Sequence, residues 1–293
     1  MRTLLVSGLI LSTTCFAQET APARPEVVDG SLGFQITSQY FFRGLLQENQ
    51  GIIFQPWVEL SWGLYDNDGD GTLRSLELNV GQWNSLHDGP TGGAGGVWYE
   101  SDFYLEVAGK LGDRLGASAA YWTYDTPNGT GSFSRGSRPV QELVFRLDYD
   151  DRGEWFESIE TGLRPWVKLA IETSGQRDVA AGGSQGAYLE LGLDPGFAIG
   201  KLGDGDLVLS LPTKLGLSLK DYYERATGGN DDFFGYLDIG AELSAPLHFL
   251  PARMGPWDAF VGLHLLFLGD NTEARNSGDA FETILSVGCS TFF

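Results

Sequence analysis

The chain has 293 residues, and its 39 acidic side chains against 19 basic ones give a formal net charge of −20. This balance excludes nucleic acid as a natural partner, because binding it requires Lys and Arg side chains that neutralise phosphates. Aromatic residues make up 13% of the chain, which excludes the acidic disordered class, since such chains are poor in aromatics.

The N-terminal segment has the pattern of a cleavable export signal. Arg2 gives a basic start, an apolar run follows, and small residues up to Ala17 precede a polar stretch. The apolar run is too short to cross a bilayer as a helix. We therefore predict a signal peptide over residues 1–17, a periplasmic lead over residues 18–30 and one outer-membrane domain over residues 31–293.

A period of two governs the chain from residue 31 onward. In each segment, apolar side chains occupy one face and polar or charged side chains occupy the other, and no helical period interrupts the pattern. Segment lengths of about ten residues match tilted strands that cross the hydrocarbon layer. The predicted strands cover residues 31–43, 52–64, 74–86, 100–111, 115–124, 142–149, 163–172, 188–197, 207–220, 233–247, 257–267 and 280–293.

The connections and the last strand decide between two β architectures. A soluble sandwich would bury the apolar faces in a core, whereas an outer-membrane barrel would turn them to lipid and pair its edges. Linkers after odd-numbered strands are mostly long and those after even-numbered strands mostly short, as in outer-membrane barrels, although segment 150–162 is long. The chain stops on Phe293 inside an alternating strand, which needs a partner on both edges. We therefore predict an all-β fold, a 12-stranded antiparallel up-and-down transmembrane β-barrel.

The first predicted strand carries a recognisable segment. Residues 36–44 read Ile-Thr-Ser-Gln-Tyr-Phe-Phe-Arg-Gly, and Gln47 and Gln55-Pro56 follow. This opening resembles that of the TorF-type porin family, whose members often begin with a Ser-Asp-Tyr-Val-Phe-Arg-Gly-like segment followed by Gln-Pro. Here Gln39 stands where the family usually has an acidic residue. The resemblance implies an outer-membrane barrel, and the transport substrates of the family are mostly assigned by analogy.

The polar faces of the strands predict the lining of the lumen. Twelve strands give an interior between the filled core of eight-stranded barrels and the open channel of sixteen-stranded ones. The lining is mixed in charge with acids in excess, so a narrow pore would favour cations by electrostatic focusing. A lumen filled by salt bridges is the alternative. The predicted pore-lining residues are Arg43, Glu59, Glu100, Asp102, Glu106, Lys110, Glu142, Arg146, Arg164, Lys168, Glu172, Glu190, Lys214, Asp238, Glu242 and Glu282.

The segment between the second and third predicted strands has the spacing of a calcium loop. Asp66, Asp68 and Asp70 occupy positions one, three and five of the twelve-position EF-hand pattern, and Glu77 occupies position twelve. Carboxylate oxygens at this spacing can surround Ca²⁺, but the flanking segments are strands and not helices. An acidic, glycine-rich hairpin turn is the alternative. Beyond this calcium hypothesis we expect no cofactor.

No local signature of a hydrolase accompanies His87, His248 or His264, and we expect no enzymatic activity. We predict an outer-membrane porin-like channel for passive diffusion of small hydrophilic solutes or ions. A non-conducting structural or adhesion barrel, whose surface loops bind partners, is the alternative. The expected partners are outer-membrane lipid, small solutes, periplasmic chaperones and the barrel-assembly machinery.

Overall fold

The computed structural model describes residues 28–67, 71–93, 95–129, 139–156, 159, 161–175, 185–224 and 230–293. In this part of the chain, no helix is long and apolar enough to cross a membrane. The helical turns are α1 (Pro90–Gly93), η1 (Ala252–Met254) and α2 (Asp270–Arg275). The barrel wall consists of β1 (Val28–Thr37), β4 (Ile53–Asp66), β5 (Leu73–His87), β6 (Trp98–Leu111), β7 (Leu115–Asp125), β8 (Val140–Tyr149), β9 (Trp166–Ser174), β10 (Ala187–Leu193), β13 (Thr213–Lys220), β14 (Phe234–Pro246), β15 (Trp257–Leu268) and β16 (Phe281–Phe292).

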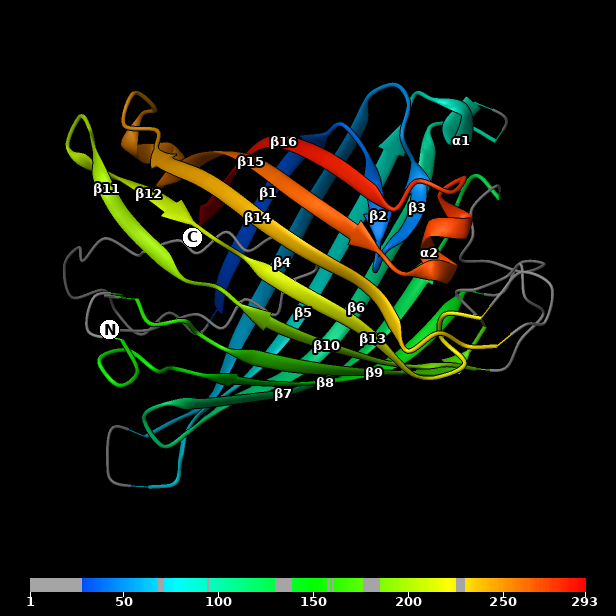
Figure 1. Ribbon diagram of the computed structural model, residues 1–293. Helices are drawn as coiled ribbons and strands as arrows, with labels where there is room; N and C mark the ends of the chain where they lie inside the picture. The colour runs from blue at the N-terminus through cyan, green and yellow to red at the C-terminus, as the bar shows by residue number, and fades with distance from the viewer. Residues whose placement is uncertain are drawn as a thin grey trace.

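The wall closes through the pairing of its first and last strands. Each wall strand pairs antiparallel with its neighbours, and β1 pairs with β16 from Ser31 opposite Phe292 to Thr37 opposite Ser286. Closure leaves no open edge in the ring, as the predicted 12-stranded antiparallel barrel requires, and the prediction is confirmed. We call the end where β1 begins and β16 ends the terminal end. The opposite end, near the inner hairpin of residues 40–48, is called the hairpin end (Figure 1).

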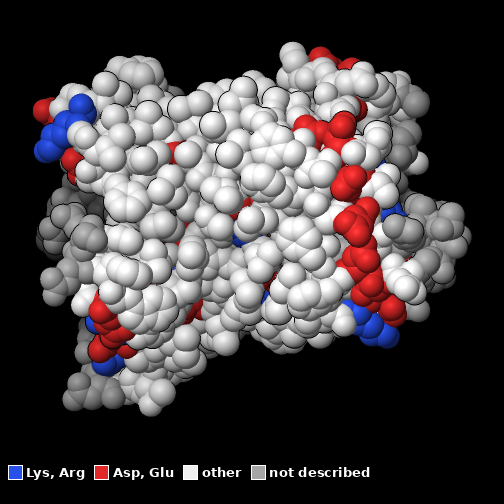
Figure 2. Space-filling model, viewed as in Figure 1, with Lys and Arg blue, Asp and Glu red and all other residues white. Residues whose placement is uncertain are grey.

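The outer face of the wall is apolar. On β6, the outward side chains Phe103, Leu105 and Val107 are 47%, 45% and 42% exposed, whereas the intervening Tyr104 and Glu106 are buried. The alternation follows from the period of two in a strand, which sends successive side chains to opposite faces. Figure 2 shows a broad uncharged band between two charged rims. A surface with this distribution is typical of a barrel surrounded by lipid.

A short hairpin inside the barrel is the main departure from the predicted strands. The first strand ends at Thr37, and β2 (Tyr40–Phe42) and β3 (Leu45–Glu48) form a separate two-stranded sheet. The tip between them, Arg43-Gly44, has φ of +49° and +78°, which matches the tight hairpin turns with positive φ at both central residues. Figure 1 shows this hairpin between β16 on the near wall and β5 and β6 on the far wall.

Two predicted strands are each divided by a proline. β11 (Gly196–Leu202) follows β10 after Pro195, and β12 (Gly205–Ser210) precedes β13 before Pro212. Proline has no N–H for the ladder, so the regular pairing stops at both positions. β11 and β12 pair with each other and extend the wall at the terminal end (Figure 1).

The predicted N-terminal segments are covered only in part. Residues 28–30, assigned to the periplasmic lead, form the beginning of β1. Residues 1–27, which include the predicted signal peptide, lie outside the described residues.

Candidate functional site in the barrel lumen

One side of the hairpin β2–β3 is anchored to β5 and β6. The hydroxyl of Tyr40 donates a hydrogen bond to Oε2 of Glu100 at 2.8 Å. The Tyr40 ring lies 5.4 Å from the ring of Trp83 and 6.0 Å from that of His87, between ring centres. Glu100 and His87 are both 0% exposed. The hairpin therefore seals a carboxylate and an imidazole of the wall from water.

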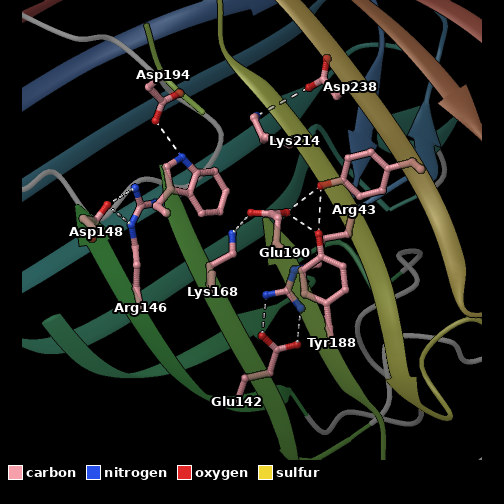
Figure 3. A network of polar contacts seen from close by, with 12 residues as sticks. Arg43, Glu142, Arg146, Asp148, Lys168, Tyr188, Glu190, Asp194, Lys214 and Asp238 are labelled. Atoms are coloured by element: carbon pink, nitrogen blue, oxygen red, sulfur yellow. Dashed lines mark hydrogen bonds and ion pairs between the residues drawn. The ribbon is translucent and has the colours of Figure 1, made fainter. Parts of the chain in front are cut away.

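At the hairpin tip, Arg43 contacts β8, β10 and the segment after β13. Its Nη1 and Nη2 donate to the two carboxylate oxygens of Glu142 on β8, at 3.0 and 2.9 Å. Nη1 also donates to the hydroxyl of Tyr222 at 2.8 Å, and the guanidinium carbon lies 4.4 Å from the centre of the Tyr188 ring. Figure 3 shows the guanidinium between the Glu142 carboxylate and Tyr188. The side chains of Arg43 and Glu142 are 6% and 0% exposed, so this ion pair is shielded from solvent.

The base of the hairpin is fastened by Glu48. Its Oε2 accepts hydrogen bonds from the backbone N–H and the hydroxyl of Thr91 in α1, at 2.9 and 2.7 Å. Its Oε1 accepts from the backbone N–H groups of Asn49 and Gln50, both at 2.9 Å. Burial raises the pKa of Glu48, but the hydrogen bonds from Thr91 and the two backbone groups outweigh burial and leave the pKa below its usual value.

A second polar network lies next to Arg43 and joins three wall strands. Lys168 on β9 forms an ion pair with Glu190 on β10. Glu190 also accepts hydrogen bonds from the hydroxyls of Tyr188 and of Tyr236 on β14, the latter at 2.6 Å. The two tyrosine hydroxyls are 2.9 Å apart. One carboxylate thus holds Lys168, Tyr188 and Tyr236 together (Figure 3).

Further ion pairs follow along the same side of the lumen. Nζ of Lys214 lies 3.6 Å from Oδ2 of Asp238, and Nδ1 of His264 lies 2.8 Å from Oδ1 of the same carboxylate. Arg146 donates from Nε and Nη2 to Oδ1 of Asp148, at 2.8 and 2.6 Å. The basic side chains of β8, β9 and β13 are therefore each matched with an acid.

The side formed by β4 to β7 combines carboxylates with stacked rings. Glu59 accepts a hydrogen bond from the hydroxyl of Tyr104, and Glu106 accepts one from the amide of Asn79 at 3.0 Å. The rings of Tyr104 and Trp122 are stacked with their centres 4.1 Å apart. Neutral donors thus contact two of the acids here, in contrast to the ion pairs across the lumen.

Toward the terminal end, the lining of β5 to β9 becomes partly accessible to water. Glu77, Lys110 and Ser118 are half-buried, and the side chains of Arg146 and Lys168 are 15% and 17% exposed. At the hairpin end, inward residues of the same strands are buried. The lumen is therefore closed at the level of the hairpin and more open beyond it.

The structure places most of the predicted pore-lining residues on inward positions of the wall. Arg43 differs, because it lies on the hairpin and not on a wall strand. Arg164 also differs, because it precedes β9 and donates its backbone N–H to Asp151 at 2.7 Å. The residues on inward wall positions are Glu59, Glu100, Asp102, Glu106, Lys110, Glu142, Arg146, Lys168, Glu172, Glu190, Lys214, Asp238, Glu242 and Glu282.

The predicted pore lining omits the aromatic residues of the lumen, although the alternation places Tyr104, Tyr188 and Tyr236 on the polar faces of their strands. Tyr104, Trp122, Tyr188 and Tyr236 are all buried and face inward. The available signal was their spacing, because Tyr104 stands two residues from inward acids on β6 and Tyr188 stands two residues before Glu190. Attention to charge alone left these rings out of the predicted lining.

The structure describes two of the four residues of the predicted calcium site, Asp66 and Glu77. Asp66 ends β4 opposite Ser75, and Glu77 lies further along β5, opposite Gly63. Asp68 and Asp70 lie outside the described residues. Within the described ranges, no group of three or more His, Cys, Asp or Glu side chains is placed to hold a metal ion. Calcium at this turn stays a prediction.

Comparison with known proteins gives structural likenesses at low identity. No protein-family model matches the chain, and there is no match among curated proteins. The chain is 15% identical to the β-domain of the Bordetella autotransporter BrkA, covering 91% of this chain and 99% of that one, with a TM-score of 0.42. It is 10% identical to a bacterial polysaccharide outer membrane secretin (91% and 98% covered, TM-score 0.46). It is also 10% identical to the translocator domain of the autotransporter NalP from Neisseria meningitidis (92% and 89% covered, TM-score 0.40).

These likenesses do not support membership of the TorF-type family in particular. The closed ring, the apolar outer belt and the polar lumen define this chain as a barrel of the outer-membrane type. Its function has to be argued from its own lumen.

Proposed function

We propose that this chain is a bacterial outer-membrane channel for passive diffusion of small hydrophilic solutes, and that the hairpin β2–β3 is the element that closes it. The observation that carries this proposal is the position of the hairpin. It spans the lumen from Glu100 on β6 to Tyr188 on β10 and Tyr236 on β14, yet it lies outside the wall sheet. Short links, Ser38-Gln39 and residues 49–52, connect it to β1 and β4. Such an element can leave the lumen while the wall ladder stays intact.

The lengths of the connections orient the channel. The turn between β6 and β7 has three residues, 112–114, whereas β7 and β8 are separated by residues 126–139. Outer-membrane barrels have short periplasmic turns and long outer loops. The terminal end then faces the periplasm, and the hairpin closes the channel near the outside.

The charge of the lumen favours cations in this channel. Glu59 on β4 and Glu106 on β6 accept hydrogen bonds from neutral donors. On the opposite side of the lumen, basic side chains such as Lys214 already form ion pairs with acids of that side. The lining therefore keeps an excess of negative charge, which raises the local concentration of cations in a narrow, low-dielectric passage.

We assign no catalytic role to the histidines. Nε2 of His87 lies 2.7 Å from Oγ of Ser85, but the His87 ring is stacked on Tyr99 at 4.4 Å between ring centres and lies under the hairpin. His264 is bound to Asp238. Both rings have the contacts of a packed polar core.

Conductance in planar bilayers tests the proposal. The comparison uses the intact protein and a variant with residues 40–48 replaced by Gly and Ser in equal number. A control variant carries the same replacement over the exposed turn 247–255. We expect rare, short openings from the intact protein and the control, and a steady conductance several-fold larger from the hairpin variant. The reversal potential in a salt gradient should have the sign of cation preference.

A silent membrane with all three folded proteins would contradict the channel. That result would favour the alternative, a non-conducting structural or adhesion barrel in which the hairpin is a permanent part of the core. Equal conductance of the three proteins would also contradict the role of the hairpin as the closing element.

A further inference from the structure

The groups that contact Arg43 form a receptor for a guanidinium group. Two parallel hydrogen bonds to the Glu142 carboxylate, a third to the Tyr222 hydroxyl and the face of the Tyr188 ring surround the planar cation. The Phe42 ring lies 4.9 Å from the guanidinium carbon and completes the enclosure. Bidentate carboxylate pairing and stacking on an aromatic face are the interactions that distinguish guanidinium from ammonium.

Apart from Phe42, the groups that form the receptor lie outside the hairpin. Glu142, Tyr188 and Tyr222 belong to β8, to β10 and to the segment after β13. The hydroxyl of Tyr124 on β7 donates to Oε2 of Glu142 at 3.1 Å, which orients the carboxylate independently of Arg43. The site therefore keeps its acceptor and its aromatic face when the hairpin leaves.

We propose that Glu142, Tyr188 and Tyr222 form a binding site for guanidinium-bearing solutes, which Arg43 of the hairpin occupies in the closed channel. The identification of such solutes as cargo rests on the proposed channel function, whereas the binding site does not. A solute of this class competes with Arg43 for the same carboxylate, and its binding releases the hairpin tip. The carboxylate left behind has lost its cationic partner, which favours its pairing with another cation.

Short links hold Arg43 close to Glu142, so a solute must reach a high concentration to displace it. A group held by short links competes at an effective concentration of about millimolar or more. Guanidinium solutes at lower concentration should leave the hairpin in place. Removal of the Arg43 side chain abolishes this competition, so a small cation should then bind to the vacant site directly.

The test is chemical rescue of the Arg43→Ala variant in detergent micelles. Methylguanidinium is titrated against the thermal unfolding midpoint, with methylammonium at the same ionic strength as the control cation. We expect a saturable rise of the midpoint with methylguanidinium and an apparent affinity weaker by about tenfold or more with methylammonium. The double variant Arg43→Ala/Glu142→Gln should lose the response to methylguanidinium.

Equal responses to both cations, or an unchanged response in the double variant, would overturn the proposed site. If Arg43→Ala does not fold, the variant with residues 40–48 replaced by Gly and Ser supplies the same vacant site, and the same outcomes decide. The measurement involves no conductance. Saturable, Glu142-dependent binding by a protein that is silent in bilayers would therefore support the site and contradict the channel.

Discussion

The two ends of the lumen differ although the same strands build both. At the hairpin end, Glu100 and Glu142 are 0% exposed, and each receives a hydrogen bond from a hairpin side chain. At the terminal end, inward residues on the same strands, such as Lys110 on β6 and Arg146 on β8, are half-buried. The wall alone therefore does not close the lumen. At the hairpin end, residues outside the wall strands fill the core, namely the hairpin itself and Tyr222 and Tyr223 after β13.

The ion pairs show the same contrast. Arg43 and Glu142 are shielded from water, whereas Lys201 and Asp206, at the terminal end, are 4.0 Å apart with side chains 71% and 61% exposed. A shielded pair depends on both partners, because removal of one leaves a buried charge. An exposed pair contributes little, because water and salt screen it. Substitutions placed at the two ends should therefore have unequal effects.

The largest effect is expected for Lys168→Met. This change leaves Glu190 as a buried carboxylate without its cationic partner, which should lower the free energy of unfolding by about 3 to 5 kcal/mol. Urea unfolding in lipid vesicles measures the change. Lys201→Met at the exposed pair is the matched control and should stay within about 0.5 kcal/mol of the intact protein. Equal losses in the two variants would remove the distinction between shielded and exposed ion pairs.

Gly44→Ala should have the next largest effect. Gly44 has a φ of +78°, and a Cβ there would lie 3.0 Å from the Tyr236 ring. The left-handed backbone and the close contact together should destabilise the docked hairpin by about 2 to 4 kcal/mol. Gly112→Ala is the control, because Gly112 has a φ of +59° and open space around its Cβ, so it should lose only about 1 to 2 kcal/mol.

The difference between these two glycine variants isolates the contact between hairpin and wall. Urea unfolding gives the stabilities, and bilayer recording gives the fraction of time spent open. A longer open time for Gly44→Ala and an unchanged one for Gly112→Ala is the expected result. Indistinguishable variants would mean that the tip does not depend on Tyr236.

The wall was predictable from the sequence because a membrane barrel imposes a local rule on every strand. Outward positions must be apolar, so the alternation of Phe103, Leu105 and Val107 with polar neighbours identifies β6 without knowledge of its partners. The alternation in the last strand also indicates closure of the barrel, because a strand in lipid needs a partner on both edges. The inward positions follow from the same parity, which is why most predicted lining residues lie on inward wall positions.

The hairpin was not predictable by that rule. Its alternation continues that of β1, and the polar residues between the predicted strands 31–43 and 52–64 indicate a long outer linker. What folds it inward is complementarity with residues far away in the chain, since Arg43 is 99 positions from Glu142 and 179 from Tyr222. The local signal was the Arg43-Gly44 pair, which suits a tight turn with positive φ.

Tyr40→Phe and Tyr149→Phe each remove one hydroxyl, and together they compare a hydrogen bond at the hairpin end with one at the terminal end. Tyr40→Phe removes the donor to Glu100 in the packed core at the hairpin end, and a hydrogen bond to a charged group contributes about 1.5 to 3 kcal/mol. Tyr149→Phe removes a similar bond to Glu154 at the exposed terminal end, where water replaces the donor, so the loss should stay below about 0.5 kcal/mol. Thermal or urea unfolding of the two variants provides the comparison, and a Tyr149→Phe loss as large as that of Tyr40→Phe would contradict it.

The smallest effect concerns Glu48, whose hydrogen bonds with Thr91 fasten the base of the hairpin, and it depends on pH. The pKa of Glu48 lies below its usual value because hydrogen bonds from Thr91, Asn49 and Gln50 outweigh burial, so the ionised form stabilises the docked hairpin. This contribution is fully present above the unfolded-state pKa, at about pH 4.3, and is lost as the pH falls through the lowered pKa of the docked state. The protection factors of the hairpin amides, which correct for the slower intrinsic exchange in acid, should therefore fall in the intact protein below that value.

Glu48→Gln supplies the reference for this step. The amide keeps one acceptor oxygen, so the loss at neutral pH should be about 0.5 to 1 kcal/mol, the net value of about one hydrogen bond. The variant should have slightly lower protection factors at neutral pH and show no further decrease assigned to residue 48 on acidification. Because Glu48 holds the base of the hairpin and the Arg43–Glu142 ion pair holds its tip, acid should loosen the hairpin from its base while the tip is still held. Exchange that begins at the Arg43 tip instead would show that the hairpin opens from the lumen side.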